Sequence, residues 1–189
     1  MVDLTLMRTL FLDRDGVINV ERKNDYAKNI TEFAFIDGAL DAIALLSAKF
    51  DNIFIVTNQR GVGRGVMSQA DLDMVHEYMI KEIEARNGQI SKIYTCTDIN
   101  SDSINRKPNT GMAFLARKDF PAVEFKRSVL VGNSKSDIQF GKKLDMYTVL
   151  VGDKYPRDNE IYDIIDAYFP NLYEFALSLY NTENNTYTK

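Results

Sequence analysis

Short apolar runs separated by longer amphipathic stretches are the feature of this 189-residue chain that most restricts its fold. The runs contain β-branched or aromatic residues and are almost continuously apolar, which is typical of strands buried on both faces. They fall at residues 8–12, 52–56, 90–94, 128–131 and 147–151. The repeated order of strand, helix and strand predicts an α/β fold, with right-handed crossovers and a doubly wound parallel sheet covered by helices on both faces.

The stretches between these runs have helical periodicity. The clearest helix covers residues 69–86, where apolar residues recur at helical spacing. Ser68 and Asp71 resemble a capping box at its start, and Asn87-Gly88 ends it. The other expected helices cover residues 37–49, 110–118, 134–143, 160–167 and 172–179.

Length and composition predict one globular domain over residues 1–180, followed by a polar tail, 181–189, that we expect to fray. The single cysteine excludes an internal disulfide framework and is typical of a reducing compartment. The net charge of -4 argues against nucleic-acid binding as the main activity. No apolar run approaches the roughly 20 residues of a membrane span. We therefore expect a cytoplasmic protein without nucleic-acid or membrane partners, and no oligomeric state is predicted.

Polar motifs follow the first two predicted strands, where parallel sheets form their sites. Asp13 and Asp15 come after the first strand, and their i, i+2 spacing would point both carboxylates at one cation; a solvated Asp/Gly turn is the alternative. The second strand leads into TNQRGVGRG at residues 57–65. Its hydroxyl, amide and guanidinium groups and its glycines predict a phosphate cradle, with a flexible connection as the alternative.

Two further motifs follow the third and fourth predicted strands. Arg106-Lys107-Pro108 comes after a polar loop, and the proline favours a positioned lysine over a mobile one. A plain lead-in to a helix is the alternative. The oxygen-rich turn at residues 132–137 follows the fourth strand, and its alternative role is a helix N-cap by Asn133 or Ser134. The ordered arrival of these motifs after successive strands is more specific than any one of them.

In this order the motifs resemble those of the haloacid dehalogenase superfamily, over about residues 8–180. The resemblance implies a magnesium-dependent phosphatase without a large cap. It implies Asp13 as the nucleophile that forms an aspartyl-phosphate and Asp15 as general acid and then base. Thr57 would bind the phosphoryl group, Lys107 would hold nucleophile and phosphate together, and the metal-site residues would be Asp13, Asp15, Asn133 and Asp137.

Asn133 departs from the superfamily pattern, which usually has aspartate there. An amide oxygen can still bind magnesium but adds no negative charge, so we expect weaker metal affinity. Magnesium accepts oxygen ligands and keeps several waters, so two or three protein oxygens suffice. Positive charge is needed because a carboxylate that attacks a phosphate dianion meets charge repulsion.

Within the superfamily, the strings FLDRDGVIN, FAFIDGALDAI, TNQRGVGRG and RKPNTGM resemble small-capped phosphatases of heptose bisphosphate and of histidinol phosphate. Arg60 and Arg64 are expected to bind a phosphate that is not hydrolysed, because the planar guanidinium suits phosphate oxygens. The expected substrate-binding residues are Asn58, Gln59, Arg60, Arg64 and Arg106.

Those relatives carry a zinc loop of three cysteines and one histidine before the RKP motif. Here the segment 96–105 has only Cys96 and no histidine, so we expect no zinc. His76 is predicted to have a structural role beside the apolar stripe of its helix, and Cys96 to be a small buried residue at a strand end.

The sequence therefore predicts a magnesium-dependent phosphatase of a small phosphorylated metabolite, with D-glycero-D-manno-heptose 1,7-bisphosphate as the preferred substrate. Histidinol phosphatase is the alternative enzyme. A non-catalytic binding protein that kept the fold is the alternative from another class, and retention of Asp13, Asp15, Thr57 and Lys107 argues against it.

Overall fold

The computed structural model describes residues 3–23 and 25–184. Six parallel strands form one sheet in the order β3-β2-β1-β4-β5-β6. This is a doubly wound order, and its reversal lies between β1 and β4. The strands are β1 (Thr9–Leu12), β2 (Asn52–Asn58), β3 (Lys92–Cys96), β4 (Ser128–Gly132), β5 (Tyr147–Val151) and β6 (Ala167–Phe169).

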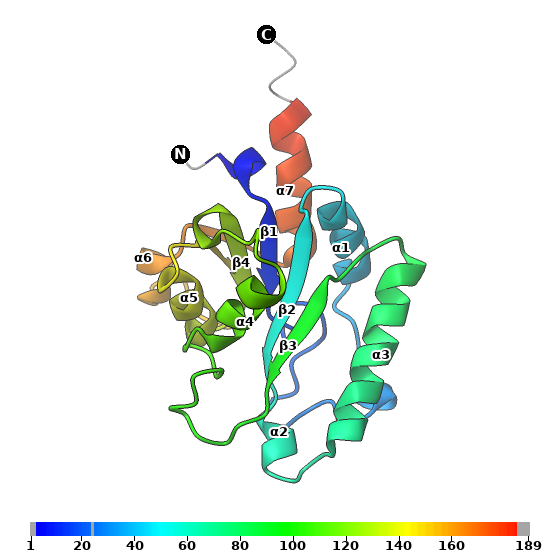
Figure 1. Cartoon of the computed structure of the whole chain (residues 1–189). Helices are drawn as coiled ribbons and strands as arrows, with labels where there is room; N and C mark the ends of the chain where they lie inside the picture. Colours follow the sequence, from blue (N-terminus) through cyan, green and yellow to red (C-terminus); the bar gives the residue numbers. More distant parts are fainter. Residues whose placement is uncertain (1–2, 24, 185–189) are drawn as a thin grey trace.

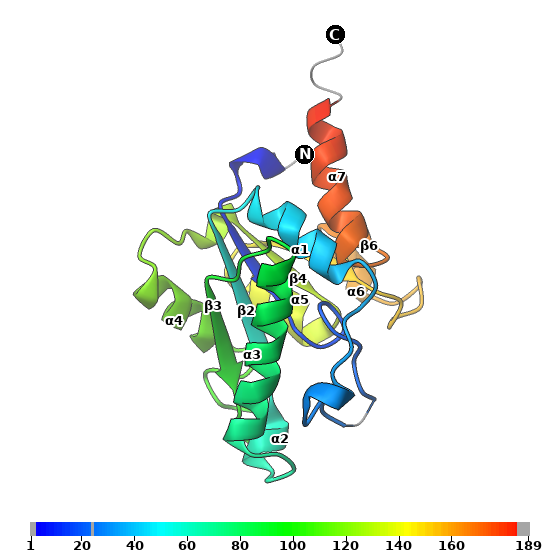
Figure 2. The same ribbon diagram turned by 90° about the vertical axis from the view of Figure 1, so that its right-hand side faces the viewer.

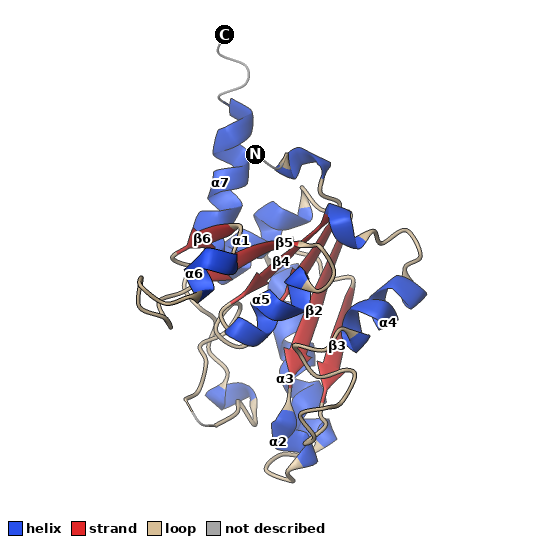
Figure 3. Cartoon of the chain, turned by 90° about the vertical axis from the view of Figure 1, so that its left-hand side faces the viewer, coloured by secondary structure: helices blue, strands red, loops and turns tan. Residues whose placement is uncertain are grey.

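Helices cover both faces of the sheet (Figures 1–3). One face carries α1 (Ala39–Ser47), α3 (Gln69–Ala85) and α7 (Leu172–Asn184), and the other carries α4 (Gly111–Asp119) and α5 (Lys135–Lys142). Side chains alternate along each strand, so Leu10 and Leu12 pack into the first core and Phe11 into the second. The short elements are α2 (Arg60–Gly63), α6 (Ile161–Ile164), η1 (Leu4–Leu6), η2 (Ile30–Glu32) and η3 (Phe125–Arg127).

The connections after β1 and β2 contain only short helical turns, η2 and α2. Among the described residues no separate cap domain stands over the sheet. No described helix has both the length and the apolar composition needed to cross a bilayer.

Two predicted strands have different bounds in the structure. β2 continues to Asn58 and β3 lies at Lys92–Cys96, because Phe54 pairs with Lys92 and Asn58 pairs with Cys96. Thr57 and Asn58 are therefore the last residues of a strand, and their backbone is held by the sheet. The capping box of α3 is confirmed, with the Ser68 hydroxyl accepting from Asp71 N–H and the Asp71 carboxylate accepting from Ser68.

The prediction of a helix over residues 160–167 is wrong. The helix α6 is a single turn, Ile165 is extended, and residues 167–169 form the edge strand β6 against β5. Asp166 fixes this register because its carboxylate accepts hydrogen bonds from the backbone N–H (2.7 Å) and hydroxyl (2.9 Å) of Thr148. The segment expected to fray is helical to Asn184, and residues 185–189 lie outside the described part.

Candidate active site

Asp13 and Lys107 form the centre of the candidate site at the carboxyl ends of the central strands. Lys107 Nζ lies 2.8 Å from Asp13 Oδ1 and 2.6 Å from Asp137 Oδ1, and the lysine side chain is only 2% exposed. Burial alone would lower the pKa of Lys107, but the attraction of Asp13 and Asp137 outweighs it and raises the pKa. The lysine is therefore a fixed, charged group between two carboxylates from β1 and the start of α5.

The environment of Asp13 disfavours the charged form of its carboxyl group. Burial first, and then the charge of Asp137, raise the pKa of Asp13 to about 7, although Lys107 acts in the opposite direction. Asp13 Oδ1 also accepts a hydrogen bond of 2.8 Å from Arg14 N–H. A buried carboxylate in this state gains from any additional cation, because opposite charge favours ionisation.

Asp15 is held by four hydrogen bonds from three side chains. Arg14 Nη2 donates to both carboxylate oxygens at 3.0 Å, Asn19 Nδ2 donates to Oδ1 at 2.9 Å, and Gln59 Nε2 donates to Oδ2 at 2.7 Å. Burial raises the pKa of Asp15, but the charge of Arg14 and these hydrogen bonds outweigh burial and lower the pKa. Its side chain keeps 26% exposure, so one side of the carboxyl group remains open to a ligand.

Thr57, Asn58 and Gln59 lie at the end of β2 but have different environments. Thr57 is buried beside Gln59, whose Nε2 donates to its hydroxyl at 2.9 Å. The Asn58 amide accepts from Lys107 N–H (3.1 Å) and donates to the Lys107 carbonyl (3.2 Å). Asn58 thus holds the backbone of the central lysine, and Gln59, fully buried, holds Asp15. Gln59 Oε1 is buried without a hydrogen-bond partner among the described residues, and contact of Asn58 and Gln59 with substrate stays a prediction.

Arg60, Arg64 and Arg106 form an arginine cluster beside these residues. Burial and then the charge of Arg60 lower the pKa of Arg106, and Arg64 contributes in the same direction. No carboxylate of the described residues pairs with any of the three guanidinium groups. Arg60 Nε and Arg106 Nη1 are buried without a hydrogen-bond partner. Concentrated positive charge with unused donors is suited to a phosphate or carboxylate group.

Close backbone approaches hold the cluster in place. A Cβ atom at Gly63 would lie 2.2 Å from the carbonyl oxygen of Thr97, so α2 can touch the segment after β3 only with glycine at this position. Gly61 is also closely approached, in this case by a side chain: the ring of Tyr26 would lie 2.8 Å from a Cβ atom placed there. The guanidinium groups of α2 and of the RKP motif are thereby brought together from two strands.

Asn133 and Asp137 both follow β4, but their side chains contact different residues. Asp137 Oδ2 accepts from the Ser134 N–H (3.0 Å) and hydroxyl (2.6 Å), and Oδ1 faces Lys107, so both oxygens have partners. Ser134, not Asn133, is the N-cap of α5. Asn133 Nδ2 donates to Glu21 Oε2 at 3.0 Å, and no described residue donates to its Oδ1. Asp137 thus supports the lysine, and Asn133 keeps an oxygen available.

The available oxygens fit a hard divalent cation such as magnesium. Gly16 has φ +84°, and a Cβ atom there would lie 1.8 Å from Asn133 Nδ2, so the loop after Asp15 lies directly against Asn133. The carbonyl oxygen of Asp15 accepts no hydrogen bond from the described residues. No three His, Cys, Asp or Glu side chains of the described part gather as a metal-binding group. A cation here would therefore use carboxylate, amide and carbonyl oxygens together with water.

The loop after β3 is organised by a small polar network. Asp98 Oδ2 accepts hydrogen bonds from Cys96 Sγ (3.7 Å) and from the hydroxyl of Ser103. Asn109 Nδ2 donates to the Ser103 carbonyl at 2.9 Å and connects this network to the RKP segment. Cys96 is buried, as predicted. Thiol, carboxylate and hydroxyl groups thus connect the two ends of the loop.

Sequence reasoning missed three residues that contact the predicted ones, Arg14, Asn19 and Glu21, and it missed Lys154, which contacts Glu21. Arg14 lies between Asp13 and Asp15, where alternation along an extended segment would point it away from them. Its side chain is fully buried and reaches back to Asp15. Lys154 contacts both oxygens of Glu21, at 2.8 and 2.9 Å. Only the position of Arg14 and Asn19 within FLDRDGVIN could have signalled their role.

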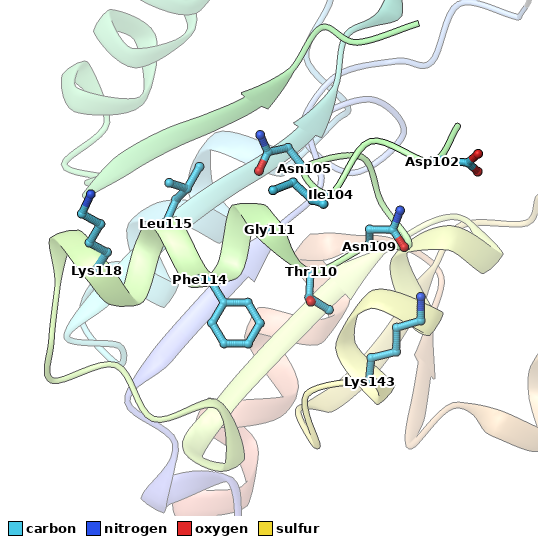
Figure 4. A pocket seen from close by; sticks show the side chains of 10 residues that line it. All are labelled: Asp102, Ile104, Asn105, Asn109, Thr110, Gly111, Phe114, Leu115, Lys118 and Lys143. Carbon is cyan, nitrogen blue, oxygen red and sulfur yellow. The ribbon is translucent and has the colours of Figure 1, made fainter. Parts of the chain in front are cut away.

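A cavity of about 610 Å³ lies beside α4 and the loop that precedes it (Figure 4). Phe114 and Leu115 of α4, Ile104 of the preceding loop and Lys143 border it. None of the four motifs contributes a predicted catalytic residue to its lining. The predicted catalytic residues therefore lie at the carboxyl ends of the strands and not in this cavity.

Comparison with known proteins agrees with this arrangement. A profile of the family described as polynucleotide kinase 3 phosphatase matches residues 9–164. The D-glycero-α-D-manno-heptose-1,7-bisphosphate 7-phosphatase of Campylobacter jejuni is 34% identical over 167 residues, which are 88% of this chain and 92% of that protein. The D-glycero-β-D-manno-heptose-1,7-bisphosphate 7-phosphatase of Neisseria meningitidis is 35% identical over 70% of this chain and 71% of its own.

A solved structure gives the same result at the level of the fold. The D,D-heptose 1,7-bisphosphate phosphatase of B. bronchiseptica, in complex with magnesium and phosphate, superposes with a TM-score of 0.79 at 25% identity. The match covers 93% of this chain and 99% of that one.

Proposed function

This chain belongs to the polynucleotide kinase 3 phosphatase family within the haloacid dehalogenase superfamily, and on that premise we propose that it hydrolyses D-glycero-D-manno-heptose 1,7-bisphosphate with magnesium. The relatives reported above support the reaction and the sugar. The arginine cluster is the observation in this chain that supports a substrate with two phosphates.

Phosphoryl transfer would begin at Asp13. Its carboxylate attacks phosphorus, the bond from phosphorus to the ester oxygen breaks, and Asp15 gives its proton to that oxygen. Lys107 stays between Asp13 and Asp137 and offsets the charge on the transferring group. In the second step Asp15, now a carboxylate, takes a proton from water, and the water oxygen attacks phosphorus. Inorganic phosphate leaves and the Asp13 carboxylate is restored.

Magnesium, when bound, supplies positive charge that reduces repulsion between the phosphate and the carboxylates. Asp13, the Asp15 carbonyl and Asn133 Oδ1 would hold it, with Asp137 in the outer shell beside Lys107. Thr57 would donate its hydroxyl proton to the phosphoryl group, since its oxygen already accepts from Gln59.

The second phosphate would be held by the arginine cluster. Three guanidinium groups without carboxylate partners lie beside the catalytic residues, where they would attract a further anionic group. Histidinol phosphate carries a cationic amine at its far end, and the same cluster would repel it. Removal of the 7-phosphate, with the 1-phosphate in the cluster, is the orientation that matches the names of the relatives.

The test is a comparison of kcat/KM for the heptose 1,7-bisphosphate in both anomeric forms, a sugar monophosphate, histidinol phosphate and a 3′-phosphorylated oligonucleotide. We expect the bisphosphate to be preferred. Arg64→Ala should lower kcat/KM for the bisphosphate by the equivalent of about 1–3 kcal/mol and leave the monophosphate almost unchanged.

Arg8→Ala is the matched control, because Arg8 is a similarly exposed arginine at the opposite end of β1 and pairs with Asp51. A higher kcat/KM for histidinol phosphate or for the oligonucleotide than for the bisphosphate would show that the proposed substrate is wrong. An equal ratio of kcat/KM for bisphosphate and monophosphate in wild type and Arg64→Ala would show that the cluster does not bind the second phosphate.

A further inference from the structure

Arg14 is the largest fully buried side chain among the described residues, and it connects Asp15 to helix α3. Its Nη2 contacts both carboxylate oxygens of Asp15, and its Nη1 lies 3.0 Å from Nε2 of His76. His76 is the only histidine of the chain, and it belongs to α3, which covers the face of the sheet opposite α4 and α5 (Figure 2). A helix that carries no catalytic motif thus reaches the general acid through one arginine.

The contact fixes the chemical state of the imidazole. A guanidinium group only donates hydrogen bonds, so His76 Nε2 accepts and the ring proton resides on Nδ1. Burial first, and then the charge of Arg14, lower the pKa of His76 to about 4, which keeps the ring neutral near pH 7. The ring also borders a surface depression of about 460 Å³ between α3 and β3.

Few other contacts hold the guanidinium group. Among the described residues, Asp15 and His76 are its only side-chain partners, and Arg14 Nε is buried without any. Without the imidazole, Nη1 would also be buried without an acceptor, so the guanidinium group would shift to find one. Any such shift moves the pair of hydrogen bonds that orients the Asp15 carboxyl group.

We propose that His76 is a positioning residue for phosphoryl transfer: through Arg14 it holds Asp15 in the orientation from which the proton reaches the leaving oxygen. This inference rests on the general-acid role of Asp15 in the proposed function. His76 touches neither substrate nor reacting atoms, and kcat/KM reports its effect on the first step, in which the ester oxygen is protonated.

Leaving-group dependence separates this role from a merely structural one. Phenyl phosphate and 4-nitrophenyl phosphate have nearly the same size, but the nitrophenolate leaves as a stable anion and gains little from protonation. A defect in the general acid therefore slows phenyl phosphate much more than 4-nitrophenyl phosphate, whereas partial unfolding slows both equally. The ratio of the two kcat/KM values is the quantity to measure.

Two variants of one residue make the comparison. His76→Leu removes the acceptor and keeps an apolar side chain, and His76→Gln restores an oxygen acceptor for Arg14. His76→Leu should lower kcat/KM for phenyl phosphate about tenfold, a fraction of the 10²–10⁴ that general acids contribute, and lower 4-nitrophenyl phosphate less than about twofold. His76→Gln should return the ratio close to that of the wild type.

Ile80→Ala and Asp15→Asn are the controls. Ile80 borders the same depression and packs against the core, and its apolar side chain offers Arg14 no hydrogen-bond acceptor, so its truncation should leave the ratio unchanged. Asp15→Asn should show the leaving-group effect at full size. If Asp15→Asn shows it and His76→Leu does not, the role of His76 is overturned. If Asp15→Asn does not show it, the general-acid assignment in the proposed function fails, and the inference fails with it.

Discussion

Asp13 and Asp15, two residues apart, have pKa values shifted in opposite directions. Burial and Asp137 raise the pKa of Asp13 to about 7, while Arg14 and the amide donors overcome burial and lower that of Asp15. The proposed roles require the reverse, an ionised nucleophile and a protonated acid. A cation beside Asp13 and a phosphate dianion beside Asp15 would each act in the required direction. Charge brought by the ligands, added to the protein's own, thus sets the protonation of the site.

His76 gives a prediction about stability and pH. An unfolded histidine has a pKa of about 6.5, and the folded pKa is about 4, because of burial and Arg14. Between these values the unfolded chain binds a proton that the folded protein does not, so this group's contribution to stability falls as the pH falls from about 6.5 to about 4. Arg14, Asp15 and Asp73 are the charged groups that act on the ring.

Urea unfolding of wild type and His76→Gln at several pH values tests this prediction. The difference in unfolding free energy isolates the histidine, because the other titrating groups are shared. The wild type should lose stability more steeply on acidification. Parallel curves would mean that folding does not shift the pKa of His76.

Asn133 gives a prediction about magnesium. Asn133→Asp adds a carboxylate where Asn133 Oδ1 has no donor, so the magnesium concentration for half-maximal activity should fall. The new carboxylate would also face Glu21, which is 43% exposed and whose charge is already paired with Lys154. Magnesium-dependent thermal stabilisation of the two proteins gives a second readout. An unchanged or higher requirement would show that residue 133 does not serve the metal.

The loop 97–105 is the element whose order the sequence left open. The structure shows a network in which Asp98 accepts from Cys96 and Ser103, and Asn109 extends it toward Arg106 and Lys107. The individual contacts were not predictable, because each involves a common side chain that could equally face water.

Asp98→Ala tests whether this network positions the site. Loss of two hydrogen bonds should reduce stability by about 1–3 kcal/mol and should lower kcat/KM as the RKP segment loosens. Asp102→Ala, an exposed aspartate of the same loop, is the control and should leave both quantities unchanged. Metal analysis of the wild type should find far less than one zinc per chain. A tightly bound zinc would contradict this account of the loop.

At the scale of elements, the strands around the site were the most predictable part. β1, β4 and β5 have the expected places, because buried parallel strands are short apolar runs. The edge strand β6 was not recognised, because its three residues, Ala167–Phe169, are only partly buried and follow a helical turn. Its position depends on Asp166 and Thr148, a contact between distant residues that no local pattern reveals.

At the scale of the whole molecule, positive charge is concentrated at one place although the net charge is negative. The chain has a net charge of -4, yet three arginines that pair with no carboxylate of the described residues gather at the carboxyl ends of the strands. The sequence predicted this edge because motifs after successive strands meet there in any parallel sheet. It did not predict which polar side chains face inward: Asn58 and Gln59 hold Lys107 and Asp15, and Arg14 is buried. Such choices depend on packing between elements.

The covalent intermediate on Asp13 is the central claim, and mass spectrometry of acid-quenched Asp15→Asn tests it most directly. This variant lacks the base that activates water, so incubation with magnesium and 4-nitrophenyl phosphate, whose leaving group needs little protonation, should accumulate one phosphoryl group per chain. Peptide mapping should place that group on Asp13, and Asp13→Asn should remain unmodified and retain less than about a hundredth of the wild-type kcat, a loss of over ~3 kcal/mol. A phosphoryl group on another residue, or undiminished turnover by Asp13→Asn, would contradict the account.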